Sequence, residues 1–168
     1  MGFAGVPINL VIVGLICYAR RQEEIGGWLL FFYIQLYLGL AVSILLVPFY
    51  IANFLPSSWH DTGHYIAFLA ISLAAWAIYV TQFVVAHKLR RSRDAVYLGP
   101  LRRVLALNLG MSIVILFLDI TYSSLNIFAS SLMVIWAMVW WPYFYRSVRV
   151  GHVFVTKDWS RVAALVVD

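Results

Sequence analysis

Long apolar runs dominate the hydropathy pattern of this chain. Residues 28–54 and 65–86 contain no charged side chain, and the segment between Arg103 and Arg146 contains one, Asp119. A transmembrane helix needs about 20 predominantly apolar residues, so the first two runs suit one crossing each and the third suits two. The pattern therefore predicts four transmembrane helices, at about 28–53, 65–87, 102–120 and 126–145, with a turn at residues 121–124 between the last two.

A further apolar run, residues 2–19, precedes Arg20 and Arg21. In a cleaved signal peptide the positive charges come before the apolar run rather than after it. We therefore interpret residues 1–20 as a fifth, N-terminal transmembrane helix that stops at the two arginines. The alternative is an interfacial or partly buried helix, because about 18 residues is short for a crossing, and Pro7 and Gly14 weaken it.

Composition excludes a water-soluble domain. Of the 168 residues, 64% are hydrophobic and 11% are charged, whereas about a quarter of the residues in a soluble domain are charged. A domain of this size leaves much of its surface exposed and would not hide so many apolar side chains from water. We expect an all-α integral membrane helical bundle over residues 21–146, without a second domain.

The basic residues are confined to three segments of the chain. They are Arg20 and Arg21; Lys88, Arg90, Arg91, Arg93, Arg102 and Arg103; and Arg146, Arg149, Lys157 and Arg161. The intervening connections, 54–64 and 121–126, contain no Lys or Arg. Because basic loops stay in the cytoplasm, we expect a multi-pass protein of the bacterial cytoplasmic (inner) membrane with a cytoplasmic C-terminus. The net charge of +5 then favours anionic lipid headgroups on that side as the partner, not nucleic acid.

The C-terminal segment, residues 147–168, is a short basic tail. On helical spacing, Arg149, Lys157 and Arg161 fall on the side of Arg146, and apolar residues such as Val148 and Val155 gather on the opposite side. This pattern predicts a helix that lies on the cytoplasmic membrane surface. The alternative is a continuation of the last transmembrane helix that frays in water.

Two short motifs carry a resemblance to a known family. Residues 24–30 read Glu-Ile-Gly-Gly-Trp-Leu-Leu, and residues 141–150 read Trp-Pro-Tyr-Phe-Tyr-Arg-Ser-Val-Arg-Val, with Phe154 following. Together they resemble the bacterial domain-of-unknown-function 2569 family of small inner-membrane proteins, from about residue 23 to 156. The resemblance implies four membrane helices, but no activity and no functional residues. Residues 1–20 have no counterpart in a typical member, and Val148 stands where a basic residue is usual.

Aromatic and basic residues at the ends of the predicted helices favour contact with lipid headgroups. Trp and Tyr concentrate at membrane interfaces, and Arg pairs with phosphates there. The adjacent Gly26 and Gly27 predict a tight bend before the first of these helices. We assign the interface role to Trp28, Trp140, Trp141, Arg146 and Arg149.

Asp119 is the only carboxylate inside a predicted crossing, which makes it the first candidate for a functional site. Asn108 and Ser112 share its helix face, and other predicted helices carry Gln35 and Gln82. If these residues face inward, they form a polar seam for a proton, an ion or a small solute. The simpler interpretation is that small polar side chains pack the helices together in lipid.

The connection between the first two predicted crossings contains His60, Asp61 and His64, a weak candidate metal site. Because Pro56 and Gly63 disfavour regular helix there, a solvated loop is the better interpretation. We therefore predict no metal and no cofactor. No enzyme motif is present, such as a nucleophile elbow or a phosphate-binding loop, so we also predict no enzyme.

The small size and the scarcity of residues outside the predicted membrane segments favour a protein that acts through contacts. We expect an accessory or assembly subunit of a larger membrane complex, with other membrane protein subunits as partners. The alternative is a small oligomeric transporter or channel that uses the polar seam around Asp119.

Overall fold

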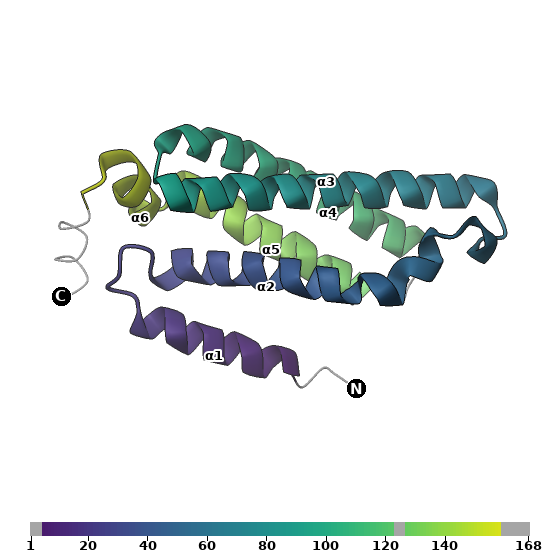
Figure 1. Ribbon diagram of the computed structural model, residues 1–168, viewed down its shortest axis with the longest axis horizontal. Coiled ribbons are helices and arrows are strands. Elements are labelled where there is room, and N and C mark those ends of the chain that lie inside the picture. Colours follow the sequence, from purple (N-terminus) through teal and green to yellow (C-terminus); the bar gives the residue numbers. More distant parts are fainter. Residues whose placement is uncertain (1–4, 123–126, 159–168) are drawn as a thin grey trace.

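The computed structural model describes residues 5–122 and 127–158, and this part of the chain is helical without any strand. Its long helices run roughly along one axis and are followed by a short helical segment at one end (Figure 1). The long helices are α1 (Gly5–Ala19), α2 (Gly27–Tyr50), α3 (Thr62–Ser92), α4 (Leu98–Tyr122) and α5 (Ile127–Arg146). The predicted all-α membrane helical bundle is confirmed.

Within the described residues, four segments are long and apolar enough to cross a membrane. They are Gly27–Pro48, Thr62–Ser92, Ala95–Thr121 and Ile127–Arg146, and they correspond one to one with the four predicted crossings. The chain is therefore a multi-pass membrane protein. Of the predicted turn at residues 121–124, Thr121 and Tyr122 belong to the end of α4, and residues 123–124 lie outside the described residues.

The N-terminal helix α1 has 15 residues, fewer than the roughly 20 needed to span the hydrocarbon core. It runs beside α2 in the opposite direction (Figure 1). Residues 1–4 lie outside the described residues, so a crossing by residues 1–20 stays a prediction. The turn between the two helices requires glycine: Gly27 has a φ of +55°, and a Cβ on Gly26 would meet the carbonyl oxygen of Arg20 at 1.8 Å. The predicted bend is present.

Short helical turns complete the connections. Two 3-10 turns, η1 (Ile51–Phe54) and η2 (Pro56–Ser58), join α2 to α3, and η3 (Ala95–Tyr97) joins α3 to α4. The described basic residues all lie near the α1–α2 connection, the α3–α4 connection or the C-terminal end of α5. These three places lie at one end of the molecule in Figure 1, which we call the basic end. The opposite end, with η1 and η2, we call the loop end.

The packed core is concentrated at the basic end. Four helices contribute buried side chains to it: Leu29, Phe32 and Tyr33 of α2, Ala86 and Leu89 of α3, Leu101 and Leu105 of α4, and Trp140 and Phe144 of α5. Toward the loop end, α3 has no buried residue before Gln82. The bundle is therefore closed at its basic end and loosely packed at its loop end.

The described part of the tail packs against the basic end of the bundle. After Arg146 the chain forms a short turn, α6 (Val148–Val150), and a π-helical segment, η4 (Gly151–Thr156). Val150, Val153 and Phe154 are at most 1% exposed and belong to the core. Their apolar side chains cap the basic end, whereas Val148 and Val155, the predicted membrane-facing residues, are exposed. The membrane-surface helix and the frayed extension both stay predictions. Residues 159–168 lie outside the described residues.

Candidate functional site

Two of the polar residues predicted to form a seam bridge α3 and α4. The side-chain amide of Asn108 donates to Oε1 of Gln82 over 3.1 Å. Gln82 is buried, and so is Ser112, whose hydroxyl donates to the carbonyl oxygen of Asn108 over 2.8 Å. An amide pair of this kind satisfies polar groups that lipid would leave unpaired.

Asp119 makes a different connection, from α4 to α5. Its carboxylate accepts a hydrogen bond from the hydroxyl of Ser130, which is buried. Ser130 was not predicted, although it is one of the few polar residues in α5. Gln35, on α2, is half-buried and makes no hydrogen bond to these polar residues in the described part of the chain. The predicted seam is therefore not continuous. It consists of two separate interhelical contacts, one between Asn108 and Gln82 and one between Asp119 and Ser130.

A cavity of about 820 Å³ lies beside Asp119 toward the loop end. Its wall is formed by α2, η1, α3 and α4, with Trp59 from the loop. The wall is largely apolar and includes several aromatic rings: Ser43, Val47, Asn53, Phe54, Trp59, His64, Ala67, Phe68, Ile71, Ser72, Ala75, Trp76, Ile115, Leu118 and Asp119. Volumes of 300–1,000 Å³ are typical of small-molecule sites. The sequence did not predict this cavity, because the cavity depends on how α2, η1, α3 and α4 are placed relative to one another.

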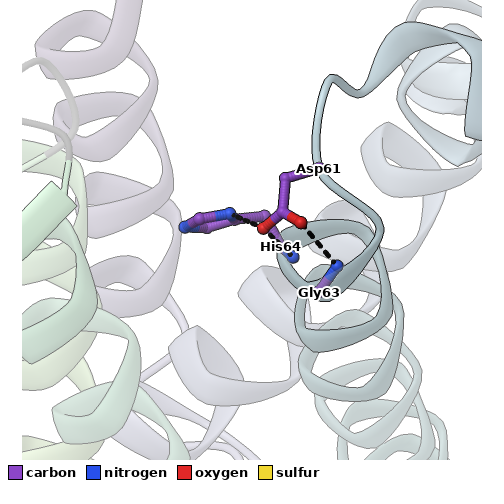
Figure 2. A network of polar contacts seen from close by, with 3 residues as sticks. All are labelled: Asp61, Gly63 and His64. Carbon is purple, nitrogen blue, oxygen red and sulfur yellow. Dashed lines mark hydrogen bonds and ion pairs between the residues drawn. The ribbon is translucent and has the colours of Figure 1, made fainter.

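The weak metal candidate forms a helix cap. Figure 2 shows the Asp61 carboxylate accepting hydrogen bonds at the start of α3 from the amides of Gly63 and His64, both over 3.2 Å, and pairing with the His64 ring. The Gly63 amide first, and then His64, lower the pKa of Asp61. His60 is exposed, and no group of three metal-ligating side chains occurs among the described residues. This arrangement is a helix N-cap.

The predicted interface residues separate into two groups. Trp28 and Trp141 are exposed, as is Arg146. Trp140 corrects the prediction: it is 2% exposed and packs 5.1 Å from Phe32, ring centre to ring centre. The Trp140 side chain lies on the side of α5 that packs against α2, so it does not face lipid headgroups.

Arg149 is held at the basic end by the α1–α2 turn. Its Nη2 donates to the carbonyl oxygen of Arg21 over 2.6 Å, and its guanidinium lies against Gly27. Burial lowers the pKa of Arg149. A second cavity, of about 590 Å³, is bordered here by Cys17, Tyr18, Arg21, Trp28, Tyr143, Ser147 and Arg149, among others.

A basic residue that the sequence did not single out also contributes. Arg102 of α4 donates from Nε to the carbonyl oxygen of Phe144 over 2.9 Å, and its guanidinium lies 4.8 Å from the ring centre of Tyr145. The carbonyl lies near the end of α5, where backbone acceptors are left over. Arg102 therefore ties α4 to the end of α5.

Comparison with known proteins gives one family. The family model described as "Protein of unknown function (DUF2569)" matches residues 22–155. The match covers α2 to η4 and leaves α1 outside it. No curated protein and no solved structure matches the chain.

Proposed function

Because the chain belongs to the DUF2569 family, whose description assigns no function, we propose a role from its geometry: a non-catalytic accessory or assembly subunit of a larger membrane complex. In this proposal the protein resides in the bacterial cytoplasmic membrane, with its basic end and C-terminus in the cytoplasm. The basis for this orientation is the gathering of basic residues at one end.

The observation that carries the proposal is an unpacked face of α3. Although α3 has 31 residues, its buried ones are Gln82, Ala86 and Leu89, all in its last third. The unpacked face lies away from these buried residues, and we call it the α3 stripe. Its residues are exposed along the helix at alternating spacings of four and three. It consists of Ile66, Ala70, Leu73, Ala77, Val80 and Val84.

The α3 stripe suits a transmembrane helix of a partner subunit. Alternating spacings of four and three are the repeat by which two helices interlock along a seam. The two alanines let a neighbouring backbone approach closely, which favours helix association in lipid. The partner we propose is thus another membrane protein that packs a helix against α3.

Affinity purification in a mild detergent tests this role. We expect a larger membrane protein to co-purify at constant stoichiometry, and Ala70→Phe or Ala77→Phe to release it. Ala129→Phe, on an exposed part of α5, is the matched control and should retain the partner. A lone monomer or homo-oligomer that persists on dilution would contradict the proposal.

Anionic lipid headgroups are the proposed second partner, at the basic end. Arg146 is exposed there, Arg149 borders the second cavity, and exposed Trp28 and Trp141 flank them. Basic residues near an anionic surface contribute about 1 kcal/mol each. Native mass spectrometry should show more retained phosphatidylglycerol in the unaltered protein than in an Arg146→Gln, Arg149→Gln variant.

A small oligomeric transporter or channel is the second candidate, favoured by the position of Asp119 in the wall of the 820 Å³ cavity. In this case the Asp119 carboxylate would bind the solute or proton in transit. Asp119→Asn should then abolish flux into proteoliposomes while Asn108→Ala reduces it less. Unchanged flux in Asp119→Asn would remove this candidate.

A further inference from the structure

The cavity at the loop end combines a single acidic group with an apolar wall. Asp119 lines it near the end of α4, and most of the remaining lining is apolar. Beyond Asp119, the polar side chains of the wall are Ser43, Asn53, His64 and Ser72. Cavities of this kind bind molecules with a large apolar body and one polar group whose chemistry the wall selects.

The distribution of charged residues around the cavity favours a cationic ligand. No Lys or Arg occurs in residues 22–87 or 104–145, so the chain supplies neither to the loop end from any of its four membrane helices. The hydroxyl of Ser130 donates to the Asp119 carboxylate but adds no charge. Among the described residues of the wall, His64 is the one basic side chain, and its ring is held by Asp61. An ionised carboxylate in a low-dielectric site is stabilised by a countercharge.

Aromatic rings on the loop-end side of the cavity suit an alkylated cation. Phe68 of α3 lies 5.0 Å from Trp59 and 5.4 Å from Phe54, measured between ring centres, and all three line the cavity together with Trp76. Ring faces attract ammonium groups, and quaternary ammonium ligands are commonly recognised by aromatic side chains. The same rings offer apolar contact to a hydrocarbon chain.

We propose that this cavity binds an amphiphilic ammonium compound, with its cationic nitrogen at Asp119 and its apolar body along the aromatic wall. The site lies on a face of α3 different from the α3 stripe, so it does not depend on the accessory role. Two sources share the chemistry: a free lipophilic amine, and the headgroup of an amine-bearing phospholipid.

Equilibrium binding to the full-length protein in a nonionic maltoside detergent tests the site. The probe is radiolabelled dodecyltrimethylammonium, compared with the uncharged isostere in which carbon replaces nitrogen. We expect one saturable site and about tenfold weaker binding of the isostere. Equal binding of the probe and the isostere to the unaltered protein would overturn the proposal.

Variants locate the binding. Asp119→Asn keeps an acceptor for Ser130 and should lower probe affinity to that of the isostere. Asp94→Asn makes the same charge change at the basic end, where Asp94 caps η3, and should leave affinity unchanged. Ser72→Trp fills the cavity from α3 without touching the charge and should abolish binding of both compounds. Unchanged probe affinity in Ser72→Trp or Asp119→Asn would exclude this cavity as the binding site. The comparison of the probe with the isostere uses the unaltered protein, so it remains valid even if a variant misfolds.

Competition distinguishes the two sources. Phosphatidylethanolamine added to the micelles should displace the probe if the natural ligand is a lipid headgroup, whereas phosphatidylglycerol should not. Displacement by neither lipid, with the probe still bound at Asp119, assigns the site to a free amine. Equal displacement by both lipids would show that the ammonium is not recognised and would overturn the proposal.

Discussion

The side-chain amide of Asn108 donates to Oε1 of Gln82 across the interface of α3 and α4, 3.1 Å away. Gln82 is 5% exposed and is the first buried residue of α3, so the pair lies where the packed basic end begins. Toward the loop end from this point, α3 borders the 820 Å³ cavity. The amide pair therefore marks the boundary between the closed and the loosely packed halves of the bundle.

We predict that Gln82→Leu and Asn108→Leu each lower the free energy of unfolding by about 1 kcal/mol, because each leaves the other amide without its partner. The double variant should lose less than the sum, since no buried amide remains. Interhelical hydrogen bonds in membranes contribute about 0.6 kcal/mol on average in double-mutant cycles. We therefore expect a coupling free energy of this size between Gln82 and Asn108. A double-mutant cycle measured in detergent by denaturant unfolding checks this. If the losses of unfolding free energy in the two single variants add up to the loss in the double variant, the two amides do not interact.

Asp61 predicts a pH dependence at the start of α3. Its pKa is lowered from the ordinary 3.8, chiefly by the amide of Gly63. A depressed carboxyl pKa stabilises the folded cap above the ordinary value, and this stabilisation is lost as pH falls through the folded pKa. The amide resonances of Gly63 and His64 should therefore shift with a midpoint below pH 3.8.

The matched variant for this titration is Asp61→Asn. Asparagine caps helices about as well as aspartate but does not titrate. The two amide resonances should then stay in place over the same pH range. A midpoint at or above 3.8 in the unaltered protein would show that the carboxylate does not cap α3.

Gly27→Ala should destabilise the protein by about 1–2 kcal/mol. Its φ of +55° is costly for a residue with a side chain, and the new Cβ would lie 3.2 Å from Nη1 of Arg149. Gly99→Ala is the control, because nothing lies within 4 Å of its Cβ and alanine favours the helix. Thermal unfolding should show a lower Tm only for Gly27→Ala. Equal Tm values would mean that the α1–α2 turn is not held in this conformation.

Two neighbouring tryptophans should differ sharply on substitution. Trp140→Ala should cost about 3–5 kcal/mol, as is usual for a large buried aromatic, since Trp140 is 2% exposed among Phe31, Phe32 and Trp136. Trp141 is 38% exposed, so Trp141→Ala should cost under about 1 kcal/mol. Comparable losses in denaturant unfolding would place Trp140 at the surface.

The hydropathy pattern predicted the existence and order of the four membrane helices because lipid requires about 20 apolar residues for each crossing. It placed the ends of α3 less well: residues 65–87 were predicted, and the helix is Thr62–Ser92. The added residues at both ends are largely polar. They are held by the Asp61 cap and by Arg93, which ends the helix at a φ of 52°.

The candidate site was only partly predictable. The sequence indicated Asp119, Asn108 and Gln82 as candidates because polar residues are rare in apolar runs. Their hydrogen-bond partners depend on which helices pack against each other, and the sequence does not show this. Ser130 was overlooked because serine is common in membrane helices. The burial of Trp140 and Phe154 depends on the direction in which each side chain points, and a uniformly apolar sequence does not encode that direction by periodicity.

Val150, Val153 and Phe154 complete the basic-end core although they follow all four membrane helices in the chain. During synthesis they become available only after the four described membrane helices have been made. Closure of the basic-end core therefore requires residues up to Phe154 in addition to the four described membrane helices. A chain interrupted between α5 and Phe154 would keep the four described membrane helices but lack the side chains that close the basic end.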